Sequence, residues 1–358
     1  MEKNKVQIKL CAQHMDKVLQ EGKQVIMIGE SGTGTIDFAR KYVAEELGKQ
    51  YDNLSGEKKE EYKIAYDQEH LHSVGGYPYT KVDDPIYKED YVKKHMKFAA
   101  FHPDYKYEDF IEGIHPMQNK EGNMIQVKLD GSFKKFCRNI VENNPSKEEK
   151  YFFIIDRIND VNIGQVFGEA MFGLDEFHRG KENRFDTKYQ NIPSCQTKRT
   201  KAGYLDNDCF NDGFYIPENL YIIATMSTPQ YSFMMNNFND NELYKYFQIV
   251  EVRANEEMEH TLLEMLNGVI DENEIKSLSE RVCNMNHILA EHNNKATSDQ
   301  SKIQIGPTYF RTYNGNNLAH IFEHHIAFAI KGYLREQFPE DQDFDLLERC
   351  WKALNGIK

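Results

Sequence analysis

Long apolar stretches are absent from this sequence. No run of apolar residues approaches the roughly 20 that a membrane-spanning helix needs, and the mean hydropathy is -0.72. Residues 1–9 are polar and contain no apolar core of the kind found in signal peptides. These features argue against a membrane protein, and we expect a cytoplasmic location.

Paired cysteines and an excess of positive charge are also missing. The six cysteines form no C-x-x-C pair, so we expect reduced thiols. A zinc site through Cys195 and Cys209 would lack a His or Cys partner at finger spacing. Lys and Arg number 44 against 57 Asp and Glu, a net charge of -13. Because phosphate neutralisation by Lys and Arg supplies most non-specific affinity, we expect no broad nucleic-acid-binding face on this chain.

Residues 25–36 predict a strand, a glycine-rich loop and the start of a helix. Their sequence is V-I-M-I-G-E-S-G-T-G-T-I, and a phosphate-binding P-loop follows the pattern G-x-x-x-x-G-K-[ST]. Gly29 and Gly34 have the required spacing, but Thr35 stands at the lysine position and Ile36 at the Ser/Thr position. The sequence therefore predicts the backbone cradle without its two chemical groups.

The rest of the chain predicts two domains. Apolar runs predict strands at 25–28, 97–101, 151–156 and 220–227. A turn is predicted at 120–123, followed by a short strand. Helical spacing predicts helices at 1–22, 37–49, 131–143 and 163–177, and then at 258–266, 274–292, 317–338 and 344–354. Alternating strands and helices are typical of a doubly wound parallel α/β sheet with ligands at the C-terminal strand ends. We expect this α/β domain at 1–250, with insertions at about 50–95 and 178–213, and a small all-helical domain at 251–358.

Three sequence blocks resemble those of one protein family. They are F-H-P-x-Y-x-Y-E-D-F-x-x-G at 101–113, F-I-I-D-x-I-N at 153–159 with F-G-E at 167–169, and I-P-x-N-L-Y-I-I-x-T-M at 216–226. A weaker block, I-G-P-T-Y-F at 305–310, is similar to the family's I-G-H-S-Y-F. On these motifs the sequence resembles, over about residues 20–335, the AAA+ module of the McrB-type GTPases, which power modification-dependent DNA restriction. The resemblance implies an AAA+ P-loop NTPase fold with a helical lid.

The sequence departs from this family at its catalytic positions. The replacements are Thr35 and Ile36 for the family's lysine and threonine, Arg157 for the glutamate after Asp156, Ser227 for the sensor asparagine, L-Y-K-Y-F at 243–247 for the arginine-finger motif L-R-R-R-F, and Pro307 for the lid histidine. Loss of an arginine finger alone costs about 10³–10⁵ in rate. We therefore expect no nucleotide hydrolysis by the usual route.

Nucleotide binding depends on other groups than hydrolysis does, chiefly on the backbone of the glycine-rich loop. Backbone N–H groups of Gly32, Thr33 and Gly34, with the N-terminus of the next helix, are predicted to form an anion nest. Asp156 retains a carboxylate for indirect contact with Mg²⁺. The candidate binding residues are Gly29, Gly32, Thr33, Gly34, Thr35, Asp156 and Arg157. We expect GTP or ATP with Mg²⁺ to bind weakly or not at all.

Arg157 and several other residues have two interpretations each. Arg157 either replaces the lost lysine charge near the γ-phosphate or pairs with Asp160 or Glu169. The aromatic residues of 101–113 either contact nucleotide or a neighbouring subunit, or pack at the sheet edge. Arg179 matches a family arginine and either serves a neighbour's site in trans or is structural. Lys and Arg at 198–201 either touch nucleic acid or are solvated. His pairs at 70/72, 287/292 and 324/325 suggest a metal, but the 287/292 spacing does not place both on one helix face.

These observations predict a catalytically degenerate McrB-like subunit. It would be a scaffold or regulatory member of a homo- or hetero-oligomeric ring in a bacterial restriction or antiviral defence system. A nuclease or DNA-reading partner chain is implied by the resemblance, because helix 1–22 is too short to be the DNA-reading domain that precedes the motor in the family. One alternative is an active ATPase or GTPase whose catalytic groups come from neighbours or unusual positions. Another is a free-standing binding module.

Overall fold

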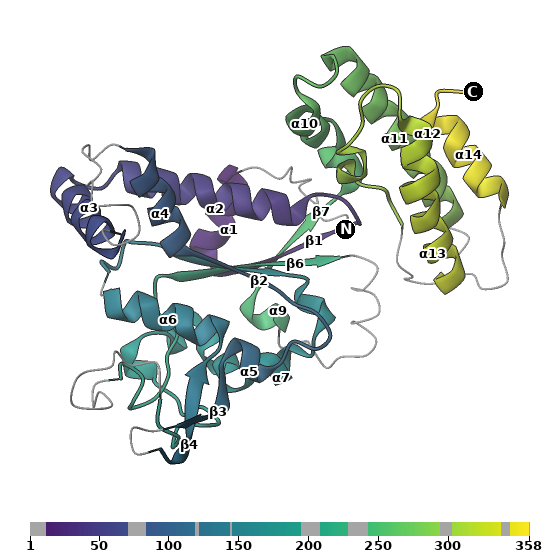
Figure 1. Cartoon of the computed structure of the whole chain (residues 1–358). Coiled ribbons are helices and arrows are strands. Elements are labelled where there is room, and N and C mark those ends of the chain that lie inside the picture. The colour runs from purple at the N-terminus through teal and green to yellow at the C-terminus, as the bar shows by residue number, and fades with distance from the viewer. Residues whose placement is uncertain are drawn as a thin grey trace, which may run out of the picture. The chain divides into compact units, whose positions relative to one another are not determined.

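The computed structural model describes residues 12–70, 84–118, 122–143, 145–194, 208–227, 243–293, 303–337 and 344–357 (Figure 1). Several residues singled out in the sequence lie outside these ranges, among them Cys195, His72, and positions 1–11 and 198–201. Within the described ranges, no helix is both long and apolar enough to cross a membrane.

A five-stranded sheet with the order β2-β5-β6-β1-β7 forms the centre of the α/β fold. Its strands are β1 (Gln24–Gly29), β2 (Met96–Ala100), β5 (Tyr151–Asp156), β6 (Leu220–Ser227) and β7 (Gln248–Val252). β1 pairs with β7, and β2 with β5, in parallel. The apolar runs of β1 and β5 are buried along almost their whole length, as expected for strands covered on both faces. The predicted parallel α/β architecture is confirmed.

Two strand features were not predicted. β7 was missed because its sequence, Q-I-V-E-V, alternates polar and apolar residues and is buried only at Val250 and Val252, as an edge strand can be. The hairpin of β3 (Glu112–Gln118) and β4 (Met124–Asp130) is antiparallel. Only its turn and second strand were predicted, because Pro116 and His115 break the apolar pattern of β3.

The described residues of the segment at about 50–95 are mostly helical. It comprises the end of α2 (Thr35–Asp52), α3 (Gly56–His70) and α4 (Pro85–His95). Asp84 caps α4 by accepting a hydrogen bond from the Ile86 N–H. Tyrosines from the three helices form a small buried cluster (Tyr51, Tyr66, Tyr87 and Tyr91). The buried tyrosines show that this part does not lie wholly on the surface, although its polar composition is typical of a surface insertion.

The helix predicted at 163–177 is much shorter in the structure. α7 (Ile163–Phe167) ends at Gly168, whose φ is 51°, and 3₁₀ turns follow at Gly168–Leu174 and Glu176–His178. A Cβ on Gly168 would lie 2.6 Å from Tyr107 Cε2. The close approach of this ring and the left-handed backbone together explain the break. Beyond it, the chain forms the 3₁₀ turn η4 (Lys181–Asn183) and an antiparallel bridge between Phe185 and Phe214.

The helices that flank the sheet occupy different faces. In Figure 1, α4 lies on one face of β2 and α6 (Ser132–Asn143) on the other. α5 (Tyr107–Phe110) contacts both α6 and α7. α1 (Ala12–Glu21) precedes β1. The helices predicted at 37–49 and 131–143 are thus present, and described residues of the predicted helix 1–22 form α1.

The C-terminal part is helical and has its own hydrophobic core. Its elements are α10 (Ala254–Leu266), α11 (Glu272–Asn293), the 3₁₀ turn η6 (Pro307–Phe310), α12 (Leu318–Ile321), a π-helical turn (Phe322–Ile326), α13 (Ala327–Gln337) and α14 (Phe344–Leu354). Leu262, Leu278 and Leu346 are among its fully buried residues. Trp351 of α14 packs against Phe322, with ring centroids 5.1 Å apart. We call this part the helical lid, and its predicted helical character is confirmed.

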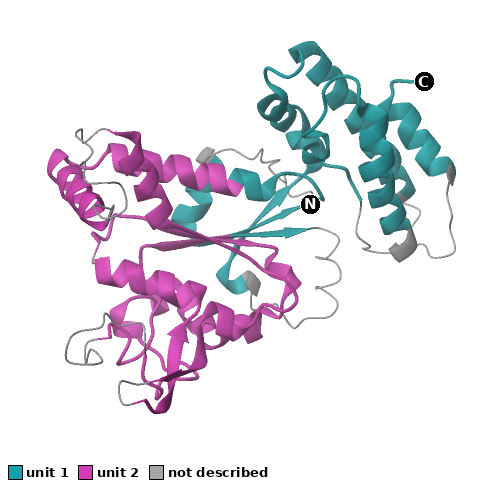
Figure 2. Cartoon of the chain, in the orientation of Figure 1, with its two compact units in different colours: residues 1–38, 224–358 teal, residues 39–223 magenta. Residues whose placement is uncertain are grey.

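The chain divides into two compact units (Figure 2). The first comprises residues 1–38 and 224–358, and the second residues 39–223. The first unit thus contains β1, the glycine-rich loop, β7 and the helical lid. The domain boundary near residue 250 stays a prediction, because compact units defined by contacts do not test it.

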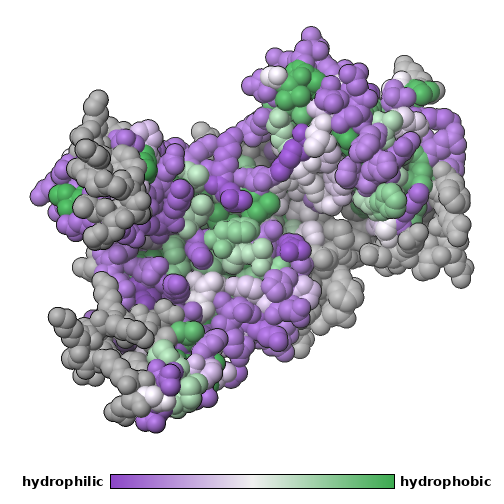
Figure 3. Space-filling model, viewed as in Figure 1, coloured by the Kyte–Doolittle hydropathy of each residue, from purple (hydrophilic) through white to green (hydrophobic). Residues whose placement is uncertain are grey.

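The surface is mostly polar, in keeping with the composition. On the face shown in Figure 3, hydrophilic residues in purple predominate and hydrophobic areas in green are separate from one another. The exposed large apolar side chains of the described residues include Phe177, Met124 and Phe328. Singly scattered apolar side chains are usual on soluble proteins and do not mark a site by themselves.

A buried histidine joins α4 to β5 within the second unit. His95 Nδ1 lies 2.7 Å from the Tyr91 carbonyl oxygen, and Nε2 lies 2.7 Å from Glu149 Oε1. Both neighbours are hydrogen-bond acceptors, so each ring nitrogen lies where it can donate to one of them. The ring stacks between Tyr91 and Tyr151, with centroid distances of 3.7 and 4.3 Å. Burial disfavours the ionised Glu149, but the hydrogen bond and charge of His95 outweigh it and hold the pKa of Glu149 below its usual range.

We expect His95→Leu to lower the free energy of unfolding by about 3 kcal/mol, because it leaves Glu149 buried without its cation. The double variant His95→Leu/Glu149→Leu should recover part of this loss. Because the folded-state pKa of Glu149 is lowered, the stabilisation is complete above its unfolded pKa of about 4.3 and disappears as the pH falls through the folded value. Urea unfolding at pH 7 and pH 3 measures both effects. An equal loss at the two pH values would contradict the charged pair.

Candidate functional site

The glycine-rich loop joins β1 to α2 with the backbone of a P-loop. Gly32 and Gly34 have φ values of 79° and 83°, in the left-handed region that favours glycine. A Cβ on Gly29 would lie 2.4 Å from Thr33 Oγ1. The glycines identified in the sequence are therefore required by the shape of the loop.

The loop uses one of its three predicted N–H donors internally. The Thr33 N–H and hydroxyl both donate to the Glu30 carbonyl, at 3.2 and 2.9 Å. For the N–H groups of Gly32, Gly34 and Thr35, the described part of the chain offers no acceptor. These groups precede the 18-residue helix α2, whose dipole adds partial positive charge at its N-terminus. The backbone can thus receive an anion through fewer donors than the sequence suggested.

The residues at the lysine and Ser/Thr positions supply no charge. Thr35 and Ile36 are the first residues of α2 and both are half-buried. Thr35 offers one hydroxyl, whereas Ile36 has no oxygen to ligate Mg²⁺. The cation that a P-loop lysine would place against the β- and γ-phosphates is missing from these positions.

The helical lid is hydrogen-bonded directly to the carbonyl groups of this loop. Gly306 N–H donates to the Ser31 carbonyl at 2.9 Å, and Thr308 donates both its N–H and its hydroxyl to the Gly32 carbonyl, each at 2.9 Å. The Ser31 and Tyr309 hydroxyls share a hydrogen bond of 2.9 Å. All these residues belong to the first compact unit. The lid thus holds the loop through the carbonyl groups of the loop. The N–H groups of Gly32, Gly34 and Thr35 form none of these hydrogen bonds with the lid.

Gly306 is the closest point of this contact. A Cβ on Gly306 would lie 2.2 Å from the Gly32 carbonyl carbon and 2.4 Å from Thr33 N. On the other side, a Cβ on Gly32 would lie 2.6 Å from Tyr309 Cδ2. Neither position has room for any side chain, so two glycines permit the approach of the two backbones.

Two charged residues beside the loop extend the contact with the lid. Glu30 accepts a hydrogen bond of 2.8 Å from the Ala254 N–H at the start of α10. Burial raises the pKa of Glu30, and this hydrogen bond opposes the shift. Asp37, in the first turn of α2, forms an ion pair with Arg311 of the lid. Sequence reasoning missed this role of Glu30, Gly306 and Thr308, and the signal that could have found it was the I-G-P-T-Y-F block.

Asp156 and Arg157 belong to the second compact unit. Asp156 ends β5, and its carbonyl accepts the Phe101 N–H at 2.9 Å. Arg157 has φ 56° and ψ 54°, and no other non-glycine residue in the described ranges has a positive φ. Its Nη1 lies 3.3 Å from Asp160 Oδ2. The ion-pair interpretation of Arg157 is therefore observed, and the interpretation at the γ-phosphate stays a prediction.

The sensor and arginine-finger positions lie in the first unit. Ser227 ends β6 and is half-buried. Leu243–Tyr246 forms the short helix α9, and Lys245 Nζ lies 5.2 Å from the Tyr246 ring centroid. Lys245 carries a single charge, without the bidentate fork of an arginine. Neither position supplies the amide or guanidinium group that the family has there.

Two further predictions can be compared with the structure. Phe101 and Phe110 are fully buried and pack edge to face, with ring centroids 5.4 Å apart. The packing interpretation of the 101–113 block therefore holds for them.

Arg179 is 3% exposed and donates a hydrogen bond to the Leu220 carbonyl. Burial lowers its pKa to about 10. Its burial and this hydrogen bond favour the structural interpretation of Arg179, and a role in trans stays a prediction. Among the described residues, no group of His, Cys, Asp and Glu could hold a metal ion.

We expect Gly306→Val to lower the free energy of unfolding by about 1–3 kcal/mol, because the new side chain would overlap the Gly32 backbone. Gly332→Ala in α13 is the matched control, since a Cβ there meets nothing within 4 Å. It should be neutral or stabilise the protein by up to about 1 kcal/mol. Urea unfolding measures both. Equal effects of the two substitutions would mean that the lid does not rest on the loop.

Comparison with known proteins adds an independent result. No family model matches the sequence. The chain is 30% identical over 215 residues to the type IV methyl-directed restriction enzyme EcoKMcrB subunit of Escherichia coli (strain K12), a match covering 60% of this chain and 40% of that protein. The chain thus matches less than half of the length of this curated relative.

Solved structures resemble the chain only weakly. The Walker-type ATPase of Pyrococcus abyssi has a TM-score of 0.35 at 12% identity, covering 92% of this chain and 75% of that one. NtrX from Brucella abortus has a TM-score of 0.32 at 9% identity, covering 99% and 64%. These likenesses are too weak to carry an argument. The sequence match and the P-loop backbone on a parallel sheet agree, and over 60% of its length the chain is similar to the McrB subunit.

Proposed function

We propose that the chain is a catalytically degenerate McrB-like subunit that binds GTP or ATP with Mg²⁺ weakly and does not hydrolyse it. The observation that carries the proposal is a P-loop backbone with Thr35 and Ile36 at its lysine and Ser/Thr positions and Arg157 after the retained Asp156. The N–H groups of Gly32, Gly34 and Thr35 are available to an anion, whereas Ile36 and Arg157 cannot ligate Mg²⁺ or orient a water molecule.

The side chains at the catalytic positions argue more strongly against nucleotide hydrolysis than against nucleotide binding. A cation at position 157 cannot accept a proton, and Arg157 is paired with Asp160. Asp156 is retained at the end of β5 and would contact Mg²⁺ indirectly. A nucleotide would therefore be held by backbone groups and one carboxylate, without the point charge of a lysine.

The proposed biological role is based on the similarity to the McrB subunit of Escherichia coli. That protein is named as a subunit of a methyl-directed restriction enzyme. We propose that this chain is a scaffold or regulatory member of a ring, homo- or hetero-oligomeric, in a restriction or antiviral defence system. DNA reading and cleavage would then be carried out by partner chains. The alternative is an active ATPase or GTPase with catalytic groups from neighbours or unusual positions.

Restoring the two missing groups tests the nucleotide site. We expect Thr35→Lys/Ile36→Thr to raise affinity for GTP or ATP with Mg²⁺ by roughly 10–100-fold, because a charge-assisted hydrogen bond is worth about 1.5–3 kcal/mol. Neither the wild type nor this variant should release phosphate while Arg157 is unchanged. Equilibrium binding of GTP, ATP, GDP and ADP, with phosphate release measured on the same preparation, provides both readings.

The matched control makes the same two chemical changes at exposed positions, Thr312→Lys/Ile64→Thr, and should leave affinity unchanged. Phosphate release by the wild type that Asp156→Ala abolishes would establish the alternative and refute the proposal. An unchanged affinity in Thr35→Lys/Ile36→Thr would mean that nucleotide does not occupy this loop.

Assembly is tested separately by mass photometry. We expect the chain to form oligomers, alone or with a partner McrB-like chain, in the presence of nucleotide. A monomer under all these conditions would contradict the ring role and favour a free-standing binding module.

A further inference from the structure

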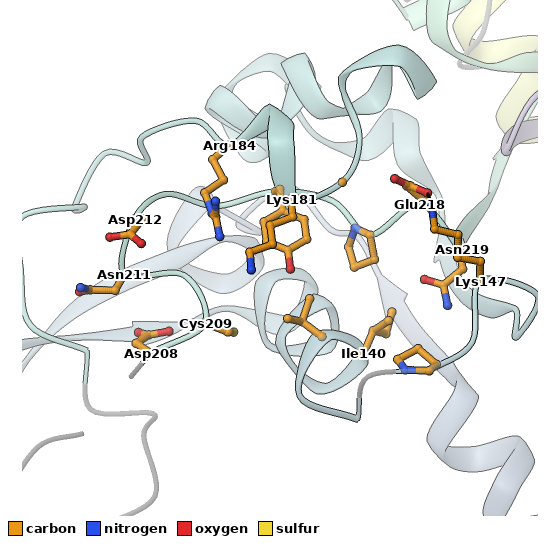
Figure 4. A pocket seen from close by; sticks show the side chains of 15 residues that line it. Ile140, Lys147, Lys181, Arg184, Asp208, Cys209, Asn211, Asp212, Glu218 and Asn219 are labelled. Atoms are coloured by element: carbon orange, nitrogen blue, oxygen red, sulfur yellow. Dashed lines mark ion pairs between the residues drawn. The ribbon is translucent and has the colours of Figure 1, made fainter. Parts of the chain in front are cut away.

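A cavity of about 640 Å³ lies in the second unit, formed by residues outside the glycine-rich loop. Its walls come from the end of α6, the segment at 180–184 and the segment at 208–219 (Figure 4). The volume is within the range of about 300–1,000 Å³ that is usual for small-molecule sites. Nothing in the proposed nucleotide chemistry uses it.

Two cations point into this cavity from one wall. Figure 4 shows the side chains of Lys181, in η4, and Arg184, just after it, directed from this wall toward the side where Cys209 and Asp208 lie. Within the described ranges, neither cation has a carboxylate within 4 Å. Arg184 Nε is buried and has no hydrogen-bond partner among the described residues. A buried guanidinium N–H that lacks an acceptor is costly, so an acceptor from a ligand would be favourable here.

The acidic residues of the cavity do not neutralise these cations. Asp208 is held by Arg138 of α6 in a buried ion pair. Glu218 lies 3.3 Å from Lys147 at the far rim. Asp212 also lines the cavity, so two cations face one further carboxylate there. The charge left inside is therefore positive, in a chain whose net charge is -13.

The rest of the cavity is largely apolar. Ile140, Val141, Pro145 and Pro217 line it, together with the buried ring of Tyr215. Arg184 Cζ lies 5.7 Å from the centroid of the Tyr215 ring, a distance at which a guanidinium interacts with an aromatic face. Burial raises the pKa of Tyr215, so the phenol keeps its proton and adds no negative charge.

We propose that this cavity binds a small organic anion, whose carboxylate or phosphate oxygens accept hydrogen bonds from Lys181 and Arg184 and whose apolar body packs on Ile140, Val141 and Tyr215. Ammonium and guanidinium groups form the strong, charge-assisted class of hydrogen bond with such oxygens. The apolar wall selects against a bare inorganic ion. The site is independent of the proposed nucleotide function.

Calorimetric titration of the full chain with phenyl phosphate, benzoate and inorganic phosphate tests the site. We expect at least one of the two aromatic anions to bind with Kd below about 1 mM and at least fivefold more tightly than inorganic phosphate. Comparison of phenyl phosphate with benzoate distinguishes phosphate from carboxylate ligands. The variant Lys181→Gln/Arg184→Gln should lose at least tenfold in affinity, whereas Lys135→Gln, at an exposed lysine of α6 outside the cavity, should lose nothing.

Two results would overturn the proposal. One is that the aromatic anions do not bind at all. The same conclusion follows if they bind the wild type and Lys181→Gln/Arg184→Gln with equal affinity, because binding at the glycine-rich loop alone would not be affected by these two substitutions. The other comes from thermal unfolding of Arg184→Met. Methionine keeps an apolar contact with the Tyr215 ring and removes the N–H that has no hydrogen-bond partner among the described residues, so Tm should be unchanged or slightly higher. A fall of more than about 4 °C, equivalent to roughly 1 kcal/mol or more, would mean that the guanidinium is structural.

Discussion

The carbonyl groups of Ser31 and Gly32 hold the helical lid against the end of β1. A side chain at Gly306 would overlap the backbone of Gly32, so this contact depends on two glycines that face each other. Through it, another part of the same chain helps to hold the loop in shape. The loop is well defined although Thr35 and Ile36 stand at the lysine and Ser/Thr positions.

Positions that the resemblance assigns to catalysis have structural partners here. Arg157 is paired with Asp160, and Arg179 supports the carbonyl of Leu220 from inside the fold. The left-handed backbone at Arg157 costs roughly 1 kcal/mol for a residue other than glycine. Such strain is retained only where the surrounding structure determines it. Arg157 thus combines an uncommon backbone conformation with a surface ion pair.

Sequence patterns predicted the sheet well and its connections less well. β1, β5 and β6 are continuous apolar runs, and burial on both faces makes such runs unambiguous. The contact between Gly306 and Gly32 joins residues 274 positions apart, and no local pattern encodes it. The end of α7 at Gly168 depends on the ring of Tyr107, which comes from a distant helix. The positive cavity at Arg184 was also missed, because its lining comes from three separate segments whose polar composition predicts only loops.

The single tryptophan of the chain lies in the helical lid, where Trp351 stacks near Phe322. The 21 tyrosines include the buried cluster of the second unit. Light absorbed selectively by indole will therefore produce emission from the lid alone, whereas tyrosine emission includes the rest of the molecule. Tryptophan emission therefore reports on the lid, and tyrosine emission also reports on the second unit, without any added fluorophore. Recording both during thermal unfolding of one sample shows whether the lid and the second unit unfold at the same temperature.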